Sequence, residues 1–296
     1  MSETGGRELR QLGDVLSWTI QRFQDLGIPS ARLDAELLLA GSLGVERLDL
    51  YTSYHRPLDA AERARFRELI VRRSRKEPVA YLLGEREFFS LPFFVDSSVL
   101  IPRPESEHIV ECALEKLKER ESETLRVLDL GSGSGNLSIS IAVNEPRARV
   151  DAVDISPDAI QTAKRNAERN EASERVTFHH GDLFDALTTG DAYDVIVSNP
   201  PYIRGDEMET LMPDVRLHEP ELALVDTKSD DRDGLGFYHS IAAGARDRLR
   251  DGGWLIVEVG EGQAGQVSEL FRRAGLGSVD TINDYGQIER VVIGQR

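Results

Sequence analysis

Residues 127–135 read Val-Leu-Asp-Leu-Gly-Ser-Gly-Ser-Gly, an apolar run that passes directly into a loop containing three glycines. The next residues, 136–143, suit a helix, so this stretch predicts a strand, a tight loop and a helix. Glycines let a backbone turn tightly and approach a ligand closely, and the start of a helix favours negative charge. The stretch therefore indicates a ligand-binding loop in an α/β fold.

The spacing of the glycines separates this loop from two common nucleotide-binding loops. A dinucleotide-binding loop of the GxGxxG type would have its third glycine where this chain has Asn136. A phosphate-binding P-loop requires Gly-Lys-Ser/Thr, and this stretch contains no lysine. The pattern that remains is GxGxG, preceded by Asp129.

Strand-like and helix-like segments alternate from residue 125 onward. The expected strands are 126–130, 150–153, 176–178, 195–198 and 254–259, and the expected helices are 136–143, 157–169 and 238–249. This alternation predicts a doubly wound, mostly parallel sheet. The runs 279–282 and 290–293 flank Asp284-Tyr-Gly286 with no helix between them, which predicts an antiparallel pair at the sheet edge.

The N-terminal part of the chain has a different pattern. Helical periodicity runs from residue 7 to about 82, and Asp59 with Glu62 three positions later has the spacing of a capping box. In the second helix, Leu33 is expected on the apolar side. Two short β-like runs within 85–100 predict a hairpin around Ser90-Leu91. We therefore expect a helical domain over 1–82, a hairpin linker over 83–105 and a sheet domain over 106–296.

Composition excludes several classes of protein. A chain of 296 residues suggests about two domains. Its 36 basic and 52 acidic residues give a net charge of −16, which argues against a nucleic-acid partner. One cysteine, Cys112, excludes an intrachain disulfide. The N-terminus is not a signal peptide and no apolar run reaches the roughly 18 residues of a membrane span, so we expect a cytoplasmic protein.

Two acidic residues follow expected strands beside the glycine loop. Asp154 ends the second strand, and an acidic side chain at this position can accept hydrogen bonds from both hydroxyls of a ribose. Asp182 lies in Gly181-Asp-Leu183 after the third strand, where its carboxylate could accept from an adenine amino group. Six histidines show no spacing of metal ligands, so no metal is expected.

The fourth strand ends in Ser198-Asn-Pro-Pro-Tyr202. Two prolines cannot continue a parallel ladder, so they force a rigid exposed turn. The side-chain carbonyl of Asn199 and the backbone carbonyl of Pro200 can both accept hydrogen bonds from one NH2 group and leave the far side of its nitrogen exposed. Tyr202 can stack on a planar group or face a cation.

The loop 129–135 together with Asn199-Pro-Pro-Tyr202 resembles the class I S-adenosylmethionine-dependent methyltransferases that methylate planar NH2 groups. Two further runs narrow the resemblance: 78–88 (Pro-Val-Ala-Tyr-Leu-Leu-Gly-Glu-Arg-Glu-Phe) and 101–107 (Ile-Pro-Arg-Pro-Glu-Ser-Glu). With the helical region before them, they are similar to the HemK/PrmC family of release factor glutamine-N5 methyltransferases. The resemblance covers nearly the whole chain. It implies a Rossmann-like sheet of seven strands in the order 3-2-1-4-5-7-6.

The resemblance also implies roles for individual residues. Those implied to contact S-adenosylmethionine are Gly131, Ser132, Gly133, Ser134, Gly135, Asp154, Asp182, Leu183 and Asn199. Asn199, Pro200, Pro201 and Tyr202 would hold the substrate glutamine, and Asn199, Pro200 and Tyr202 are the candidate catalytic residues. Members often carry an aromatic residue where this chain has Leu183, so an apolar or backbone contact is expected there. Glu219-Pro220 is expected near the site, with no assigned role.

The implied substrate is the glutamine of the Gly-Gly-Gln loop of class-I peptide chain release factors, recognised by the N-terminal helical domain. Three alternatives remain open from the sequence. One is an adenine-N6 DNA or RNA methyltransferase, which the net charge of −16 disfavours. Another is a ribosomal-protein glutamine methyltransferase, and the third is a non-catalytic module that binds adenosine compounds.

Overall fold

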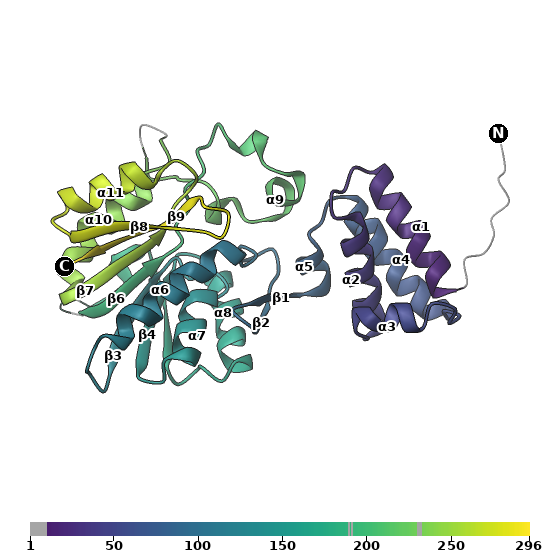
Figure 1. Cartoon of the computed structure of the whole chain (residues 1–296), viewed down its shortest axis with the longest axis horizontal. Coiled ribbons are helices and arrows are strands. Elements are labelled where there is room, and N and C mark those ends of the chain that lie inside the picture. The colour runs from purple at the N-terminus through teal and green to yellow at the C-terminus, as the bar shows by residue number, and fades with distance from the viewer. Residues whose placement is uncertain (1–10, 189, 191, 230–232) are drawn as a thin grey trace. The chain divides into compact units, whose positions relative to one another are not determined.

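The computed structural model describes residues 11–188, 190, 192–229 and 233–296. Within it the chain divides into two compact units, coloured by residue number in Figure 1. The smaller unit contains the chain up to Gly84 together with Pro213–His218. The larger unit contains Glu85–Met212 and Glu219–Arg296. No helix in the described part of the chain is long and apolar enough to cross a membrane.

The smaller unit is a bundle of helices around its own apolar core. Its helices are α1 (Leu12–Asp25), α2 (Ala31–Leu43), α3 (Arg47–Thr52), α4 (Ala60–Ser74), α5 (Val79–Leu83) and α9 (Pro213–His218). The predicted capping box is confirmed, since Asp59 and Glu62 each accept the other's backbone N–H at the start of α4. The expectation for Leu33 is wrong: it is 43% exposed, because α2 buries the adjoining face with Ala35, Leu38 and Leu39.

A buried ion pair explains why α9 belongs with this bundle. The guanidinium of Arg73 on α4 lies 2.8 Å from the carboxylate of Asp34 on α2 and 2.7 Å from that of Asp214 on α9. The imidazole of His218 contacts the carbonyl of Arg75 at 3.1 Å. A segment that is distant in sequence is thus held by charge in the helical unit.

The larger unit begins with the expected hairpin, formed by β1 (Glu85–Phe88) and β2 (Leu91–Phe94). Its register pairs Phe88 with Leu91, so the turn is Phe89-Ser90 and not Ser90-Leu91. Both turn residues have positive φ angles, 51° and 60°. Such angles give the backbone twist that suits a two-residue hairpin.

The seven-stranded sheet has the expected order, β5-β4-β3-β6-β7-β9-β8. Its strands are β3 (Leu125–Leu130), β4 (Ala148–Asp154), β5 (Val176–His180), β6 (Tyr193–Ser198), β7 (Leu249–Glu258), β8 (Gly277–Asn283) and β9 (Glu289–Gln295). The first five pair in parallel, and β9 is antiparallel to both β7 and β8. The predicted antiparallel pair at the edge is confirmed.

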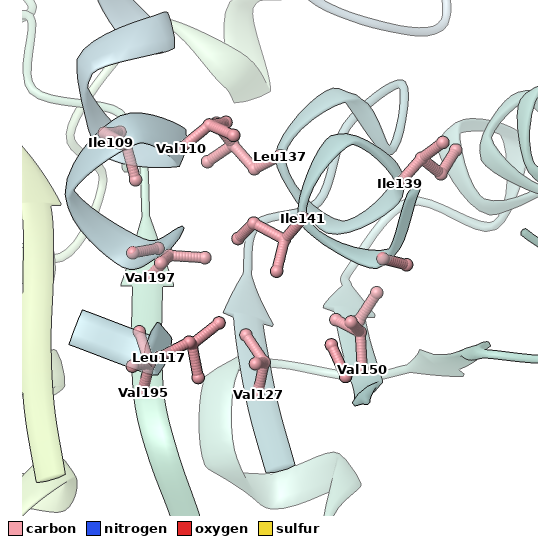
Figure 2. Close-up of a cluster of buried hydrophobic side chains, with 14 of the residues drawn as sticks. Ile109, Val110, Leu117, Val127, Leu137, Ile139, Ile141, Val150, Val195 and Val197 are labelled. Atoms are coloured by element: carbon pink, nitrogen blue, oxygen red, sulfur yellow. The ribbon is translucent and has the colours of Figure 1, made fainter. Parts of the chain in front are cut away.

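Helices cover both faces of this sheet (Figure 1). The helices of the larger unit are α6 (Glu107–Lys118), α7 (Asn136–Asn144), α8 (Pro157–Arg169), α10 (Gly236–Arg248) and α11 (Ala264–Arg273), with short 3-10 turns at Pro104–Ser106, Leu183–Ala186, Met208–Thr210 and Glu221–Ala223. Figure 2 shows Ile109 of α6 and Ile141 of α7 above Val127 and Val197 of the sheet. On the other face, α10 and α11 build a second apolar cluster.

Helix α8 matches its predicted bounds, and Ser156 caps it by accepting the N–H of Ala159 at 3.2 Å. Helix α11 was not expected from the sequence. Its signal is present, because Ala264, Val267 and Phe271 recur at helical spacing and are all buried.

Candidate active site

The loop after β3 bends through three glycines with left-handed backbone angles. Their φ values are 76° at Gly131, 52° at Gly133 and 80° at Gly135. A Cβ atom at Gly131 or Gly133 would meet nothing within 4 Å, so the backbone angle explains these two glycines and the space beside them is open. A Cβ at Gly135 would lie 2.8 Å from Ile139 and 3.2 Å from Ala163. Gly135 therefore permits the close packing of α7 against α8.

Asp154, the last residue of β4, holds this loop in place. Its Oδ2 accepts a hydrogen bond from the backbone N–H of Gly133 at 2.7 Å, and its Oδ1 accepts from the N–H of Ser156 at 2.9 Å. Burial raises the pKa of this carboxyl and outweighs the backbone N–H groups that lower it. Each carboxylate oxygen can accept a second hydrogen bond, so Asp154 can also bind a hydroxyl-bearing ligand.

A cavity opens beside the carboxyl ends of β3, β4 and β6, where the strand order reverses, as is usual for ligand sites in such sheets. The predicted site residues that line it are Gly131, Ser132, Gly133, Ser134, Asp154, Asp182, Leu183, Asn199 and Pro201. The predicted residues Gly135, Pro200 and Tyr202 lie outside its lining. Lining residues that the sequence did not single out include Thr227, Lys228 and Phe237.

The wall of this cavity contains the buried hydroxyl of Ser132. Ser132 is buried, and its Oγ has no hydrogen-bond partner among the described residues. Buried hydroxyls are normally satisfied by protein, water or a bound ligand. Together with the open space beside Gly131 and Gly133, this hydroxyl fits a polar ligand such as the nucleoside or amino-acid part of S-adenosylmethionine.

One side of the cavity carries an unexpected ion pair. The Nζ of Lys228 lies 2.6 Å from Oδ2 of Asp182, the carboxylate predicted to meet an adenine amino group. The same ammonium lies 5.4 Å from the ring centre of Phe237 on α10. Leu183 has a positive φ of 47°. The long segment 203–236 thus supplies part of the cavity wall, and its residues 230–232 lie outside the described part of the chain.

The Asn-Pro-Pro-Tyr turn leaves β6 beside the glycine loop. Ser198 fixes its start, because the Ser198 hydroxyl donates to the carbonyl of Leu130 at 2.6 Å. The Nδ2 of Asn199 donates to the hydroxyl of Ser106 at 3.0 Å. The Tyr202 side chain packs against the apolar cluster of α10 and α11, and burial raises its pKa to about 12. Tyr202 is therefore held neutral in a packed position.

Glu219, which had no assigned role, anchors the segment 101–107. Its buried carboxylate lies 2.6 Å from the guanidinium of Arg103 and accepts the backbone N–H of Ile101 at 3.1 Å. The cavity is lined by Arg103 and by Pro220, the residue after Glu219. Two stretches that are more than a hundred residues apart in the sequence thus form one wall.

Glu258 is a functional candidate that sequence reasoning missed. It is the last residue of β7, fully buried, and its carboxylate accepts a hydrogen bond from the Ser106 hydroxyl. Burial raises its pKa to about 7. An acidic residue directly after the apolar run 254–257 was the available signal, because ligands in such sheets gather at carboxyl strand ends.

The sheet order, the glycine loop and the Asn-Pro-Pro-Tyr turn define a class I methyltransferase. The fold agrees with solved methyltransferases of low sequence identity. One from Pyrococcus furiosus superposes with a TM-score of 0.51 at 20% identity, over 70% of this chain and 90% of its own. The 16S rRNA methyltransferase RsmC of Thermus thermophilus, solved with AdoMet and guanosine, gives 0.50 at 20% identity, over 72% of this chain and 49% of its own.

Sequence comparisons define the family. Residues 14–84 match the model of the PrmC N-terminal domain, and residues 110–218 match that of the methyltransferase small domain. The release factor glutamine methyltransferase of Geobacter sulfurreducens is 44% identical over 97% of this chain and 98% of its own length. That of Rhodopirellula baltica is 40% identical over the full length of both. The chain belongs to the release factor glutamine methyltransferase family.

Proposed function

We propose that this chain transfers the methyl group of S-adenosylmethionine to the side-chain amide nitrogen of the glutamine in the Gly-Gly-Gln loop of class-I release factors. Relatives of that name align over nearly the whole chain. The observation that carries the proposal is the side chain of Asn199 at the cavity. Its Nδ2 donates to Ser106, and its Oδ1 accepts no hydrogen bond from the described residues. Because release factors act on ribosomes, the reaction would take place in the cytoplasm.

The cofactor would bind along the glycine loop. Gly131, Gly133 and the hydroxyl of Ser132 would contact its polar groups, and Asp154 would accept from the ribose hydroxyls. Leu183 and Asp182 would contact the adenine. When bound, S-adenosylmethionine supplies an electrophilic methyl group on a positively charged sulfur.

The protein's task is to position a poor nucleophile. The lone pair of a carboxamide nitrogen is delocalised, so orientation toward the methyl group is essential and can contribute about 7–11 kcal/mol. The Oδ1 of Asn199 and the carbonyl of Pro200 would accept hydrogen bonds from the substrate NH2. These bonds strengthen as the nitrogen becomes positive, which stabilises the transition state more than the bound substrate. The proton of the strongly acidic methylated nitrogen would then pass to solvent.

We assign recognition of the release factor to the helical unit, which contains the predicted domain 1–82 together with Pro213–His218. This unit has a groove between α1 and α4, with Phe66 and Ile70 in its lining. Trp18 and Val71 in the same groove are 49% and 46% exposed. Exposed apolar side chains that gather in one groove support a protein-binding role for this surface.

The lining of this groove carries basic side chains, although the whole chain has a net charge of −16. Its arginines are Arg22, Arg63, Arg67 and Arg75. Charge complementarity therefore favours a segment of the release factor that combines acidic and apolar side chains. The catalytic unit would then act on a glutamine that the helical unit has delivered.

One assay separates this function from its alternatives. Tritiated methyl transfer from S-adenosylmethionine is measured to a release factor, a ribosomal protein preparation, DNA and RNA. We expect label in the release factor alone, and no label when the loop glutamine is replaced by glutamate. Label in nucleic acid or in a ribosomal protein, with none in the release factor, would contradict the proposal.

A further inference from the structure

Three side chains from distant parts of the sequence form a hydrogen-bonded chain that starts at the cavity wall. The Nδ2 of Asn199 donates to Oγ of Ser106 at 3.0 Å, and the Ser106 hydroxyl donates to Oε2 of Glu258. Ser106 and Glu258 are 1% and 3% exposed. Asn199 and Ser106 line the cavity, and Glu258 lies behind them.

The charge of Glu258 determines the direction of every bond in this chain. An ionised carboxylate can only accept, so the Ser106 hydroxyl must donate its one hydrogen to Glu258. Ser106 can then meet Asn199 only as an acceptor. The Asn199 amide must turn its NH2 group toward Ser106, and its oxygen is left on the opposite side.

The side chains around Glu258 do not make its buried carboxylate a stabilising feature of the fold. Within the described residues no lysine, arginine or histidine forms an ion pair with it. Burial is the largest influence on its pKa, which is raised to about 7. The charged and titratable groups around it are Arg103 and Arg290, which favour the ionised form, Glu105, which opposes it, and the phenols of Tyr202 and Tyr238. A buried acid without a paired cation costs stability, and such groups gather at functional sites.

We propose that Ser106 and Glu258 are positioning residues that orient the Asn199 amide so that its oxygen, and not its NH2 group, meets the substrate. The proposal rests on the proposed function, in which Asn199 accepts from the glutamine NH2. A reversed Asn199 would present a donor to a donor and would repel the substrate amide. Neither positioning residue needs to contact the substrate.

The first test compares two buried serines. Ser106→Ala should lower the single-turnover rate by about tenfold or more. Cofactor affinity and KM for the release factor should change little, because the groups that bind the cofactor and the release factor are unchanged. Ser106→Thr keeps the hydroxyl and should retain most of the activity. Ser140→Ala is the matched control, since Ser140 is buried on α7 and its hydroxyl has no partner among the described residues. A Ser106→Ala rate equal to that of Ser140→Ala would overturn the proposal.

The second test uses pH and remains decisive if Ser106→Ala fails to fold. The wild-type rate should fall by up to about tenfold between pH 8 and pH 6, as Glu258 is protonated and ceases to impose the bond direction. In Glu258→Gln this dependence should disappear, and the rate at pH 8 should be lower than wild type. Asp129, whose pKa is also raised to about 7, is retained in this variant and serves as an internal control. An unchanged profile in Glu258→Gln would contradict the proposal.

A third measurement needs no substrate, so it separates failure of this proposal from failure of the proposed function. The side-chain NH2 signals of Asn199 are assigned in a 15N-labelled protein by their loss in Asn199→Ala. They should shift in Ser106→Ala and titrate near pH 7 in the wild type. Signals unaffected by both changes would refute the chain of bonds, whatever the enzyme methylates.

Discussion

The carboxylate of Asp154 accepts the backbone N–H of Gly133 at 2.7 Å, so the acidic residue that ends β4 also shapes the glycine loop that follows β3. The neighbouring N–H of Ser156 satisfies its other oxygen. Two features that the sequence presents as separate signals, a glycine loop and an acidic residue, are therefore one structural unit. A change at Asp154 acts on both.

Replacing Asp154 with alanine should weaken S-adenosylmethionine binding by about 1.5–3 kcal/mol, roughly 10- to 150-fold, because charge-assisted hydrogen bonds are lost. Calorimetry of the variant measures this directly. Asp158→Ala, on the exposed first turn of α8, is the control and should bind as the wild type does. Unchanged affinity in Asp154→Ala would remove Asp154 from the cofactor site.

Asn199→Ala should reduce methyl transfer by about 100- to 1,000-fold, equivalent to about 2.7–4 kcal/mol, with a much smaller effect on cofactor binding. Asn199→Asp should fail nearly as severely. It would place a second acceptor against Ser106, whose one hydroxyl hydrogen already goes to Glu258. Single-turnover rates at saturating S-adenosylmethionine distinguish these variants. A nearly wild-type rate in Asn199→Asp would show that the Asn199 NH2 group is dispensable.

Asp129 provides a prediction for stability. It is fully buried at the last position but one of β3, accepts the N–H of Ser138 at 3.1 Å, and has its pKa raised to about 7 by burial. The unfolded chain releases this proton near pH 4 and the folded chain retains it until about 7, so this group lowers stability as pH rises between these values.

The pH effect of Asp129 amounts to at most about 4 kcal/mol. Asp129→Asn should therefore gain stability relative to the wild type as pH rises from 5 to 8. Urea unfolding of both proteins at these two pH values measures the change. A constant difference between them would show that Asp129 ionises normally in the folded protein.

Trp18 tests the groove of the helical unit. Trp18→Ala should raise KM for the intact release factor by roughly 5- to 30-fold, the equivalent of about 1–2 kcal/mol, and leave cofactor affinity unchanged. Leu48→Ala is a suitable control, because Leu48 is an exposed apolar residue on α3 that does not line the groove. Equal KM values for the two variants would show that the release factor does not bind at this groove.

Features encoded in short stretches of sequence were predictable. Ser156 and Pro157 marked the start of α8, and the alternation of strands and helices gave the sheet. Errors arose where a choice depended on neighbours in space. Leu33 has the chemistry of a core residue but faces outward on α2.

The residues of the candidate site also fall into two groups, those with a local signal in the sequence and those without one. The glycine loop, Asp154 and Asn199 carry local signals and line one cavity. Ser106 and Glu258 could not be joined to Asn199 from sequence, because they lie 93 and 59 residues away from it and meet it only in the folded protein. Lys228 was missed for the same reason, since its partner Asp182 is 46 residues away in the sequence.

The most direct test of the central claim is the position of the transferred methyl group. The purified chain is incubated with S-adenosylmethionine and an intact class-I release factor, and the peptide that contains the Gly-Gly-Gln loop is fragmented in a mass spectrometer. We predict one added methyl group on the side-chain nitrogen of that glutamine, formed about 100- to 1,000-fold more slowly when Asn199→Ala is used under the same conditions. A methyl group on any other residue would contradict the account. An unmodified Gly-Gly-Gln loop after incubation with folded, cofactor-bound enzyme would contradict it as well.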